Sequence, residues 1–243
     1  MAIPLIMSKV AIIIPTYNES DNIKKLVKKI NEYLNNAVIF IIDDSPSPEI
    51  SKLIDVTKNN INYFHRKNKR GRGSAVLFGI KKALKNKRIK LIIEMDADFS
   101  HDPKELKKKI NYFQKKNLEM LIASRYLTNS KIINWSLSRR IFSTLSNMLA
   151  RIFLKIKIRD FTNGFRFYSI RSAQKIIKKC GNIGDGFIIL SEIIVVIKNS
   201  NFKIEELSTI FVNRTRGESS VNLKLIIQSL FGLIKLSLIK YKL

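Results

Sequence analysis

Residues 91–98 read Leu-Ile-Ile-Glu-Met-Asp-Ala-Asp, an apolar run that ends in two carboxylates one residue apart. The run is short and rich in branched side chains, which predicts a buried strand. In an open α/β sheet, ligands bind just beyond the carboxyl ends of the strands. Asp96 and Asp98 are therefore candidates to hold one hard cation, although a lone Asp-x-Asp is more often a solvated loop.

Similar short apolar runs lie on both sides of residues 91–98. Between them, apolar side chains recur every three or four positions, as in amphipathic helices. Strands that alternate with helices predict an α/β fold with a mostly parallel, Rossmann-like sheet flanked by helices. The expected strands are 10–14, 38–42, 61–64, 91–95, 118–123, 163–168 and 203–212, and the expected helices are 22–34, 49–58, one after residue 74, one that opens at Pro103, 187–198 and 221–243.

Polar loops follow four of these strands, and they should line one edge of the sheet. They are Pro15–Glu19, Asp43–Ser45, Arg66–Ser74 and Asp96–Ser100. Glycines at positions 71 and 73 allow a ligand to approach the backbone closely. Carboxylates for a metal beside a tyrosine and glycines suit a nucleotide diphosphate.

The charge of the chain points to an anionic partner. Its 243 residues include 45 lysines and arginines against 19 acids, a formal net charge of +26. Such charge favours nucleic acid, an anionic membrane surface or phosphate-bearing substrates. A basic nucleic-acid-binding protein is the non-enzymatic alternative. No interleaved basic and aromatic motif supports it, and the clustered strand-end acids would repel a phosphate backbone, so we expect no nucleic acid partner.

Cysteine usage and the N-terminal residues bear on the compartment. The single cysteine, Cys180, excludes an intrachain disulfide, which favours a reducing compartment. Residues 1–8 lack a basic start and a long apolar run, so they do not predict a signal peptide. We expect a cytoplasmic location.

Two segments of the C-terminal half are apolar and basic at once. Residues 135–158 are too charged to span a bilayer, and residues 221–243 carry a narrow stripe of Lys224, Gln228, Lys235 and Lys242. Both suit a membrane interface, although for residues 221–243 a helix packed on the core with its lysines outward is about equally consistent. We expect a catalytic domain over 1–220 that includes an interfacial helix at about 135–157, a C-terminal amphipathic helix over 221–243, and no transmembrane domain.

In this order the motifs resemble the inverting family 2 glycosyltransferases of the GT-A fold. That family has a Pro-x-Tyr-Asn-Glu first loop, an Asp-Asp turn and an Asp-x-Asp metal site. Within it, the chain is most similar to dolichol-phosphate mannose synthase and related polyprenyl-phosphate glycosyltransferases. This closer resemblance rests on residues 123–126, 160–166, 186–187 and 214–219, together with Trp135, Arg139, Ser143 and Glu192.

The resemblance implies a role for each matching residue on the donor side. The nucleoside of a nucleotide-sugar would be held by Pro15, Tyr17, Glu19 and Asp44, with Asp43 adjacent. The metal, Mg²⁺ or Mn²⁺, and the donor pyrophosphate would be held by Asp96 and Asp98, with Ser100 at a position where some members have glutamine. Arg214 would close over the diphosphate. The family's Gly-x-Ser-Lys motif ends here in Ser220, and Lys224 is a candidate to supply the missing lysine.

On the acceptor side, the resemblance implies that a polyprenyl or dolichyl phosphate is gripped by Arg125, Arg139 and Ser143. The implied activity is transfer of a hexose, mannose from GDP-mannose above all, with inversion, and its catalytic residues would be Asp96, Asp98, Arg125 and Arg214. The alternatives are a UDP-sugar donor, or a saccharide acceptor with Asp160 as the base.

Membrane attachment and two single residues complete the expectations. The protein would be peripheral on the cytoplasmic face of a membrane, held by its own helices or by a separate membrane-embedded subunit. Trp135 is either a core residue or an interface anchor, and we expect the anchor because the helix after it is basic and apolar. Glu192 is either a satisfied buried acid or the partner of an arginine.

Overall fold

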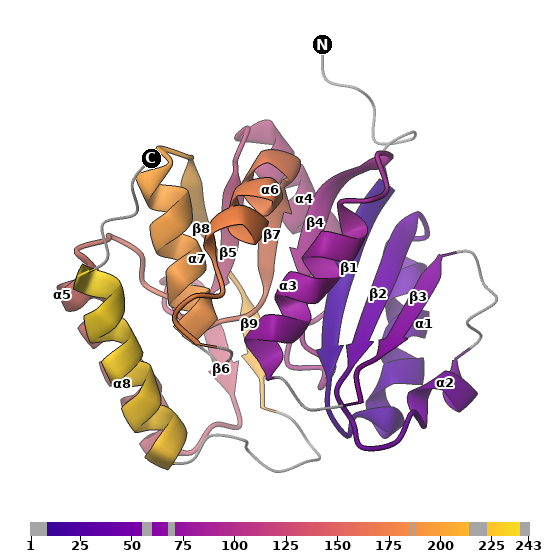
Figure 1. The fold of residues 1–243 in the computed structure, drawn as a ribbon, viewed down its shortest axis with the longest axis horizontal. Coiled ribbons are helices and arrows are strands. Elements are labelled where there is room, and N and C mark those ends of the chain that lie inside the picture. Colours follow the sequence, from indigo (N-terminus) through magenta and orange to yellow (C-terminus); the bar gives the residue numbers. More distant parts are fainter. Residues whose placement is uncertain are drawn as a thin grey trace.

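A seven-stranded sheet forms the centre of the protein (Figure 1). The computed structural model describes residues 9–54, 60–67, 71–184, 186, 188–213 and 223–238, and in the last of these ranges the side chains from residue 231. The strand order is β3-β2-β1-β4-β7-β5-β8. These strands are β1 Lys9–Thr16, β2 Ala37–Asp43, β3 Ile61–His65, β4 Ile89–Glu94, β5 Met120–Ser124, β7 Arg166–Ser169 and β8 Ile204–Ser208.

The sheet is mostly parallel, which confirms the predicted fold class. Among its described pairs, only the two that β7 makes with β4 and β5 are antiparallel. A second, two-stranded sheet pairs β6 (Lys131–Ile133) with β9 (Ile210–Val212) in parallel.

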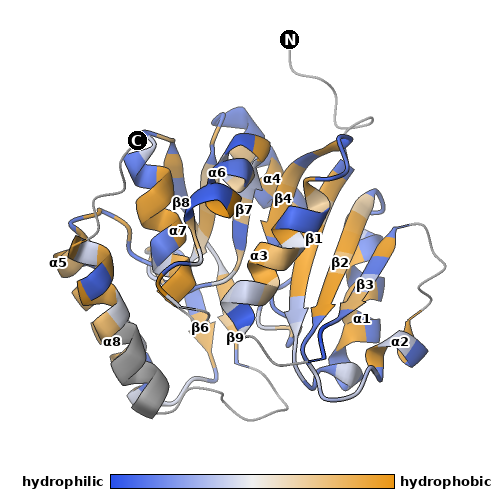
Figure 2. Ribbon diagram, viewed as in Figure 1, coloured by the Kyte–Doolittle hydropathy of each residue, from blue (hydrophilic) through white to orange (hydrophobic). Residues whose placement is uncertain are grey.

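Helices cover both faces of the central sheet and enclose one apolar core on each side. Figure 2 shows how apolar the central strands are. One core takes side chains from α1 (Ser20–Tyr33), α2 (Ile50–Leu53) and α4 (Glu105–Lys115). The other takes side chains from α3 (Arg72–Ala83), α5 (Leu137–Leu154), α6 (Ile170–Lys179), α7 (Ile188–Asn199) and α8 (Leu223–Leu238).

Strand alternation explains why both faces are apolar. In β1, Ile12 and Ile14 enter the first core while Ala11 and Ile13 enter the second, and all four side chains are fully buried. Successive residues of a strand point to opposite faces, so a strand covered on both sides needs a continuous apolar run. Gly79 of α3 allows that helix to pack closely, since a Cβ there would lie 2.4 Å from a methyl carbon of Ile13.

The structure corrects several element boundaries. β1 continues through Pro15, which pairs with Ile42 of β2 after the pairing with β4 has ended at Ile13. A proline is tolerated where one side of the strand needs no ladder donor. The single strand expected over 203–212 is wrong, because the chain leaves the main sheet at Thr209 and forms β8 and β9 in two different sheets.

Other differences concern helices. α3 begins at Arg72, inside the segment expected as a loop, and α6 and β6 were not expected at all. α2 covers only part of the helix expected over 49–58, of which 55–59 lie outside the described residues.

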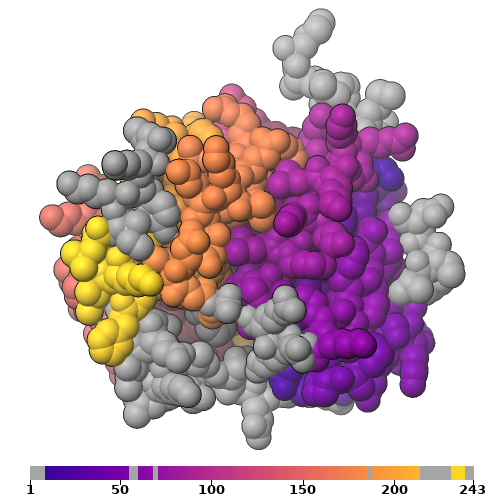
Figure 3. Space-filling model, in the orientation of Figure 1, coloured from indigo at the N-terminus to yellow at the C-terminus, as the bar shows by residue number. Residues whose placement is uncertain are grey.

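The helices α5 and α8 pack against each other at one end of the molecule, where Figure 3 shows the C-terminal part of α8 in yellow beside α7. α8 packs on the rest of the protein and buries Leu233 and Leu236. A Cβ at Gly232 would lie 2.7 Å from Ile188, so glycine permits this approach. The division of the chain at residue 220 stays a prediction.

Both of these helices expose apolar side chains. On α5 the exposed residues include Leu137, Ile141, Leu145, Met148 and Ile152, and on α8, from residue 231 onward, they are Phe231, Ile234 and Leu238. At about 100° per residue, the five on α5 fall within about 80° of one another. Within the described part of the chain, no helix is long and apolar enough to cross a membrane.

Candidate functional site

Loops that leave the carboxyl ends of the parallel strands meet along one edge of the sheet. Thr16 is in register with Asp43, and Asp43 with His65, so β1, β2 and β3 end level with one another. The Asp44 N–H donates to the Thr16 carbonyl (3.0 Å), and the Arg66 N–H donates to the Asp43 carbonyl (2.8 Å). These two hydrogen bonds hold the starts of the first three predicted loops next to one another.

Asp43 is the buried centre of this turn. Its carboxylate accepts hydrogen bonds from the Thr16 hydroxyl (3.1 Å), the Ser45 N–H (3.0 Å), the Ser45 hydroxyl and the Tyr63 hydroxyl (2.8 Å). Burial, together with the hydrogen bond to Asp43, raises the pKa of Tyr63 above its usual value. The buried carboxylate of Asp43 therefore stabilises the conformation of the Asp43–Ser45 loop.

Asp44 forms a two-pronged ion pair with Arg66. The Arg66 Nε and Nη2 atoms each lie 2.5 Å from one carboxylate oxygen of Asp44. Nη2 also donates to the Ser74 hydroxyl (3.1 Å). The Arg66–Ser74 segment is thus joined to the Asp43–Asp44 turn. The sequence did not predict this pairing, because Arg66 and Asp44 are 22 residues apart.

The first loop presents an aromatic ring at the same edge. Tyr17 is 41% exposed, and Pro15 is partly buried at the end of β1. Asn18 adopts a left-handed backbone (φ 56°), and its N–H donates to the Ser45 hydroxyl (2.9 Å). Glu19 is the residue before α1, where its carboxylate accepts a hydrogen bond from Asn22 (2.8 Å). Tyr17 is accessible for stacking on a planar base.

Asp96 and Asp98 follow β4, as expected, and both are partly exposed. The Asp98 carboxylate accepts the N–H of Ser100 (3.1 Å) across Phe99, whose backbone is left-handed (φ 60°). Ser100 is 1% exposed, and its hydroxyl oxygen is buried without a hydrogen-bond partner. A buried hydroxyl without a partner is costly unless a ligand completes it.

These three side chains fit an oxygen-preferring divalent metal. In the part of the chain that the structure describes, no group of three or more His, Cys, Asp or Glu residues is placed to hold a metal ion. The protein would thus supply two carboxylates and one hydroxyl. Such a set suits Mg²⁺ or Mn²⁺, which commonly takes its remaining ligands from water and substrate phosphates.

His101 supports the Asp96 loop from beneath. It is 1% exposed, its Nδ1 accepts the N–H of Asp96 (3.1 Å), and its Nε2 donates to Asn163 Oδ1 (2.8 Å). The two bonds fix the tautomer with the proton on Nε2. The ring also stacks on Phe165, with 5.0 Å between centroids.

Arg72 is a site residue that sequence reasoning missed. Its guanidinium donates to Glu94 Oε1 (2.6 Å) and, through Nε and Nη2, to Asp96 Oδ1 (3.0 and 2.6 Å). Burial lowers the pKa of Arg72, but attraction to Asp96 and Glu94 outweighs burial, so the pKa is raised overall. The only sequence signal was its place in a basic loop beyond a strand end.

On the acceptor side, Arg125 forms a buried ion pair with Asp160. Nε and Nη2 each donate to one carboxylate oxygen (2.8 Å each), and Nη2 also donates to the Thr162 hydroxyl (2.6 Å). Burial alone would raise the pKa of Asp160, but the charge of Arg125 and several hydrogen bonds lower it overall. Asp160 is fully buried and low in pKa, which makes it a poor general base.

Trp135 is buried rather than exposed, so the expectation of an interface anchor is wrong. It is 8% exposed, and the guanidinium carbons of Arg139 and Arg125 lie 4.5 Å and 5.2 Å from its ring centroid. Attraction of a guanidinium to an aromatic face favours this stack over exposure. The indole N–H is buried without a hydrogen-bond partner.

The structure brings Arg125, Arg139 and Ser143 into one neighbourhood. Both arginines flank Trp135. The Tyr126 hydroxyl donates to the Ser143 hydroxyl (2.6 Å), and Arg125 lies 5.6 Å from the Tyr126 ring. Arg139 also donates to Asn213 Oδ1 (2.6 Å).

Phe211 joins the two sides of the site. Its ring lies 5.6 Å from that of His101, beneath Asp96, and 5.3 Å from that of Trp135. Arg125 is 5.2 Å from the same ring. Phe211 of β9 therefore links His101, which bonds to the backbone of Asp96, to Trp135 and Arg125.

Four further residues were named from the sequence, and the structure describes the side chain of only one of them. Arg214 and Ser220 lie outside the described residues, as does the side chain of Lys224. Glu192 is buried, and its carboxylate accepts the N–H groups of Gly181 (2.9 Å) and Asn182 (3.3 Å). It is thus an acid satisfied by backbone donors, the first of the two expected alternatives.

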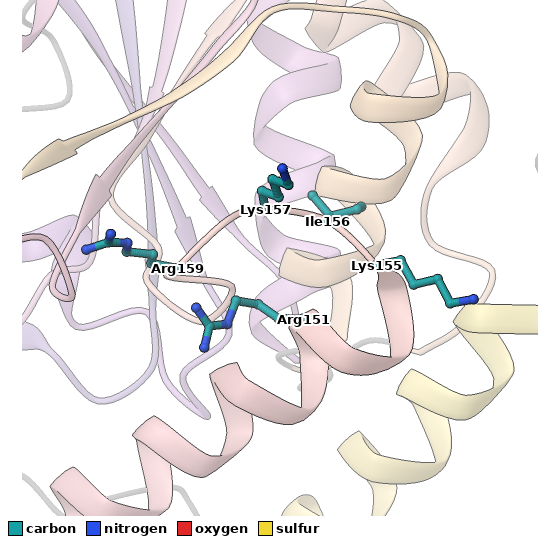
Figure 4. A pocket seen from close by; sticks show the side chains of 5 residues that line it. All are labelled: Arg151, Lys155, Ile156, Lys157 and Arg159. Carbon is teal, nitrogen blue, oxygen red and sulfur yellow. The ribbon is translucent and has the colours of Figure 1, made fainter.

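A hollow of about 480 Å³ lies at the C-terminal end of α5 (Figure 4). It is lined by Arg151, Lys155, Ile156, Lys157 and Arg159. Arg151 and Arg159 are exposed, and no carboxylate lines the hollow. This surface is strongly cationic and adjoins the exposed apolar stripe of α5.

Comparison with known proteins gives a consistent family. Residues 11–177 match the model described as glycosyl transferase family 2. The chain is 33% identical over 233 residues to a dolichol-phosphate mannosyltransferase of Pyrococcus furiosus, covering 94% of this chain and 63% of that protein. It is 28% identical over 215 residues to a polyprenol monophosphomannose synthase of Mycolicibacterium smegmatis, covering 87% of this chain and 80% of the relative. The chain thus spans less than two thirds of the Pyrococcus protein.

Solved structures share the fold at much lower identity. The glucosyl-3-phosphoglycerate synthase of Mycobacterium tuberculosis, in complex with Mn²⁺, UDP-glucose and phosphoglyceric acid, superposes with a TM-score of 0.67 at 10% identity. The match covers 95% of this chain and 80% of that one.

Proposed function

The chain belongs to glycosyl transferase family 2, and from that premise we propose that it transfers a hexose from a nucleotide-sugar to a polyprenyl phosphate. The proposed products are a polyprenyl-phosphate sugar and a nucleoside diphosphate. Attack in line with the departing diphosphate inverts the anomeric centre, so an α-linked donor gives a β-linked product. The names of the two relatives, a mannosyltransferase and a phosphomannose synthase acting on dolichol or polyprenol, support mannose as the sugar.

For the donor we propose GDP-mannose. Tyr17, exposed beside the Asp43–Asp44 turn, would stack on the base, and Pro15, Glu19 and Asp44 complete the proposed nucleoside site. The proposed diphosphate site is the Asp96 loop, with Arg214 as a further contact.

We propose a divalent cation, Mg²⁺ or Mn²⁺, on Asp96, Asp98 and Ser100. The buried hydroxyl of Ser100, which has no hydrogen-bond partner, supports this set. The solved fold relative was crystallised with Mn²⁺. When bound, such a cation neutralises the charge of a departing diphosphate.

The acceptor chemistry fits a site without a general base. A phosphate monoester has a second pKa of about 6 and is largely dianionic at neutral pH, so it needs no base to become a nucleophile. Arginine holds phosphate oxygens through charge-assisted, two-pronged contacts. In this proposal Arg139 and Ser143 orient the acceptor phosphate, with Arg125 behind them. The burial and low pKa of Asp160 speak against a saccharide acceptor that needs it as a base.

One observation carries the proposal most directly: Phe211 contacts both His101, under the donor loop, and Trp135, between the two arginines. A proposed metal-binding carboxylate pair and a cationic cluster, linked through one residue, suit a reaction between two phosphate-bearing substrates. Proximity of the two reactants then supplies a large part of the rate acceleration.

The proposal is tested by mixing the purified protein with GDP- and UDP-sugars, a polyprenyl phosphate, and Mg²⁺ or Mn²⁺, and by scoring sugar transferred to the lipid. We expect GDP-mannose to give the product. In the same assay, Arg139→Ala should raise KM for the lipid phosphate by roughly 10- to 100-fold, the worth of a charged hydrogen bond, with KM for the donor unchanged.

Arg140 provides the matched control. It is the exposed neighbour of Arg139 and donates to the Ile132 carbonyl (2.7 Å). We expect Arg140→Ala to leave KM for the lipid phosphate unchanged. Equal effects of the two substitutions would contradict the proposed acceptor site, and transfer only from UDP-sugars would contradict the donor.

We also propose that the protein works peripherally at the cytoplasmic face of a membrane. The exposed apolar stripe of α5 and the cationic hollow beside it support this, since apolar area and anionic lipid attract such a surface together. Each basic residue near anionic lipid contributes about 1 kcal/mol, and anionic lipids are concentrated in the cytoplasmic leaflet. A separate membrane-embedded subunit is the alternative.

Vesicle flotation distinguishes these two modes of attachment. We expect the protein to float with vesicles that contain anionic lipid, and Ile152→Glu, at the end of the stripe beside the cationic hollow, to abolish flotation. Gln114→Glu is the control, because it adds the same charge to an exposed position of α4, which packs on the other face of the sheet. No flotation with any vesicle would favour a membrane-embedded partner.

A further inference from the structure

We propose that Arg72 is a built-in counterion that weakens metal binding by the Asp96–Asp98 pair until a nucleoside diphosphate is present, so that metal and donor are bound together. This inference rests on the metal site of the proposed function. Arg72 would act through Asp96 and is a positioning residue.

The guanidinium of Arg72 is held in one place by two acids. It reaches both Glu94 and Asp96 from the first residue of α3, and its side chain is 16% exposed. Glu94 is completely buried, and its second oxygen accepts the Tyr168 hydroxyl (2.8 Å). Buried Glu94 therefore fixes the orientation of the Arg72 guanidinium, and that orientation brings it into contact with Asp96.

The space around the guanidinium is shaped to receive it. A Cβ added to Gly164 would lie 1.9 Å from Arg72 Nη2 and 2.8 Å from its central carbon. Only a residue without a side chain leaves room for the guanidinium here. Gly164 belongs to the loop that begins near Asp160 and includes Asn163, the hydrogen-bond partner of His101. The backbone of Gly164 does not have a positive φ, so glycine is needed there for space.

The electrostatic consequence concerns the metal. Asp96 Oδ1 receives two N–H groups of Arg72, so a cation that binds Asp96 shares its carboxylate with a fixed positive charge. Like charges at one carboxylate disfavour each other. A diphosphate adds negative charge and further oxygen ligands, which offset the repulsion. Arg72 thereby makes the binding of metal and nucleotide mutually dependent.

The test measures Mn²⁺ binding by electron paramagnetic resonance, with and without GDP or UDP, and needs no turnover. Arg72→Met alone would leave Glu94 as an unpaired buried charge, so the variant is Arg72→Met/Glu94→Gln, with Glu94→Gln as its control. We expect the double variant to bind Mn²⁺ alone at least tenfold more tightly than the control. We also expect Mn²⁺ to enhance nucleotide affinity less in the double variant, since this coupling is reciprocal.

Gly164→Ala gives an independent variant that keeps every charge. Its methyl group should displace the guanidinium from Asp96 and likewise tighten Mn²⁺ binding without nucleotide. Thermal unfolding shows whether each variant is folded. A purely structural role for Arg72 would change unfolding alone, with no change in the coupling between Mn²⁺ and nucleotide.

The outcomes separate the two proposals. If the wild type binds Mn²⁺ only with nucleotide and the coupling is unchanged in both variants, the Arg72 inference is wrong while the metal site stands. If the wild type binds Mn²⁺ neither alone nor with either nucleotide, the metal site of the proposed function is wrong, and the inference is overturned with it.

Discussion

Asp98→Asn should remove nearly all metal-dependent sugar transfer, with kcat/KM falling by roughly a thousandfold, as when a group that stabilises developing charge is lost. The amide oxygen of asparagine can still accept the Ser100 N–H, which Asp98 does now. The loop is therefore expected to keep its shape while the site loses one negative charge. The measurement is initial rate against GDP-mannose and lipid phosphate at saturating Mn²⁺.

Asp102 supplies the matched control for this substitution. Its carboxylate accepts the Lys104 N–H (3.0 Å) in the same kind of turn four residues further along. We expect Asp102→Asn to retain transfer activity and Asp98→Asn to retain its unfolding temperature. Activity above about a tenth of wild type in Asp98→Asn would show that the proposed site does not use this carboxylate as a metal ligand.

The central strands could be predicted from the sequence because they are buried on both sides. An uninterrupted branched run such as 10–14 or 38–42 has few alternatives to a central parallel strand. β7 was located by its apolar residues, but its antiparallel direction was not predicted. Direction depends on where the chain returns to the sheet, between β4 and β5, and no local pattern encodes that.

The sequence predicted where the candidate site lies, but not which arginine pairs with which acid. Strand-end acids at Asp43, Asp44, Asp96 and Asp98 could be assigned to one edge because parallel strands end together. Their partners could not, since Arg66 and Arg72 reach them from 22 to 24 residues away in sequence. In so basic a chain, which arginine meets which acid is decided by tertiary packing.

Trp135 shows how a composition argument fails. The apolar, basic helix after it suggested the membrane interface, yet the ring itself is enclosed by two arginines and Phe211. The exposed apolar residues lie further along α5 and on α8. The interface proposal therefore moves from Trp135 to the stripe around Leu145 and Ile152.

The Arg125–Asp160 pair yields the largest expected effect on stability. Removing one member of a buried pair leaves the other charge unpaired, at a cost of about 3–5 kcal/mol. Asp160→Asn should lower the free energy of unfolding by about 3 kcal/mol, the lower end of this range, because the one amide oxygen of asparagine can still accept the backbone N–H groups of Thr162 and Asn163. Chemical denaturation at neutral pH measures this directly.

The pair also predicts a pH dependence. The pKa of Asp160 is lower in the folded protein than its usual value, so its contribution is fully present above the unfolded pKa of about 3.9 and is lost as pH falls through the folded pKa. Burial raises the pKa of Glu206, an effect of opposite sign. The difference between wild type and Asp160→Asn should therefore shrink as pH falls below about 4.

A double-mutant cycle separates the pair from its surroundings. Arg125→Met should be strongly destabilising on its own, because it leaves Asp160 charged in the core. We expect the double variant to lose less than the sum of the two single losses, since it contains no unpaired buried charge. Strict additivity would mean that Arg125 and Asp160 contribute independently. Arg125 would then be open to a direct role at the lipid phosphate, as the family resemblance suggested.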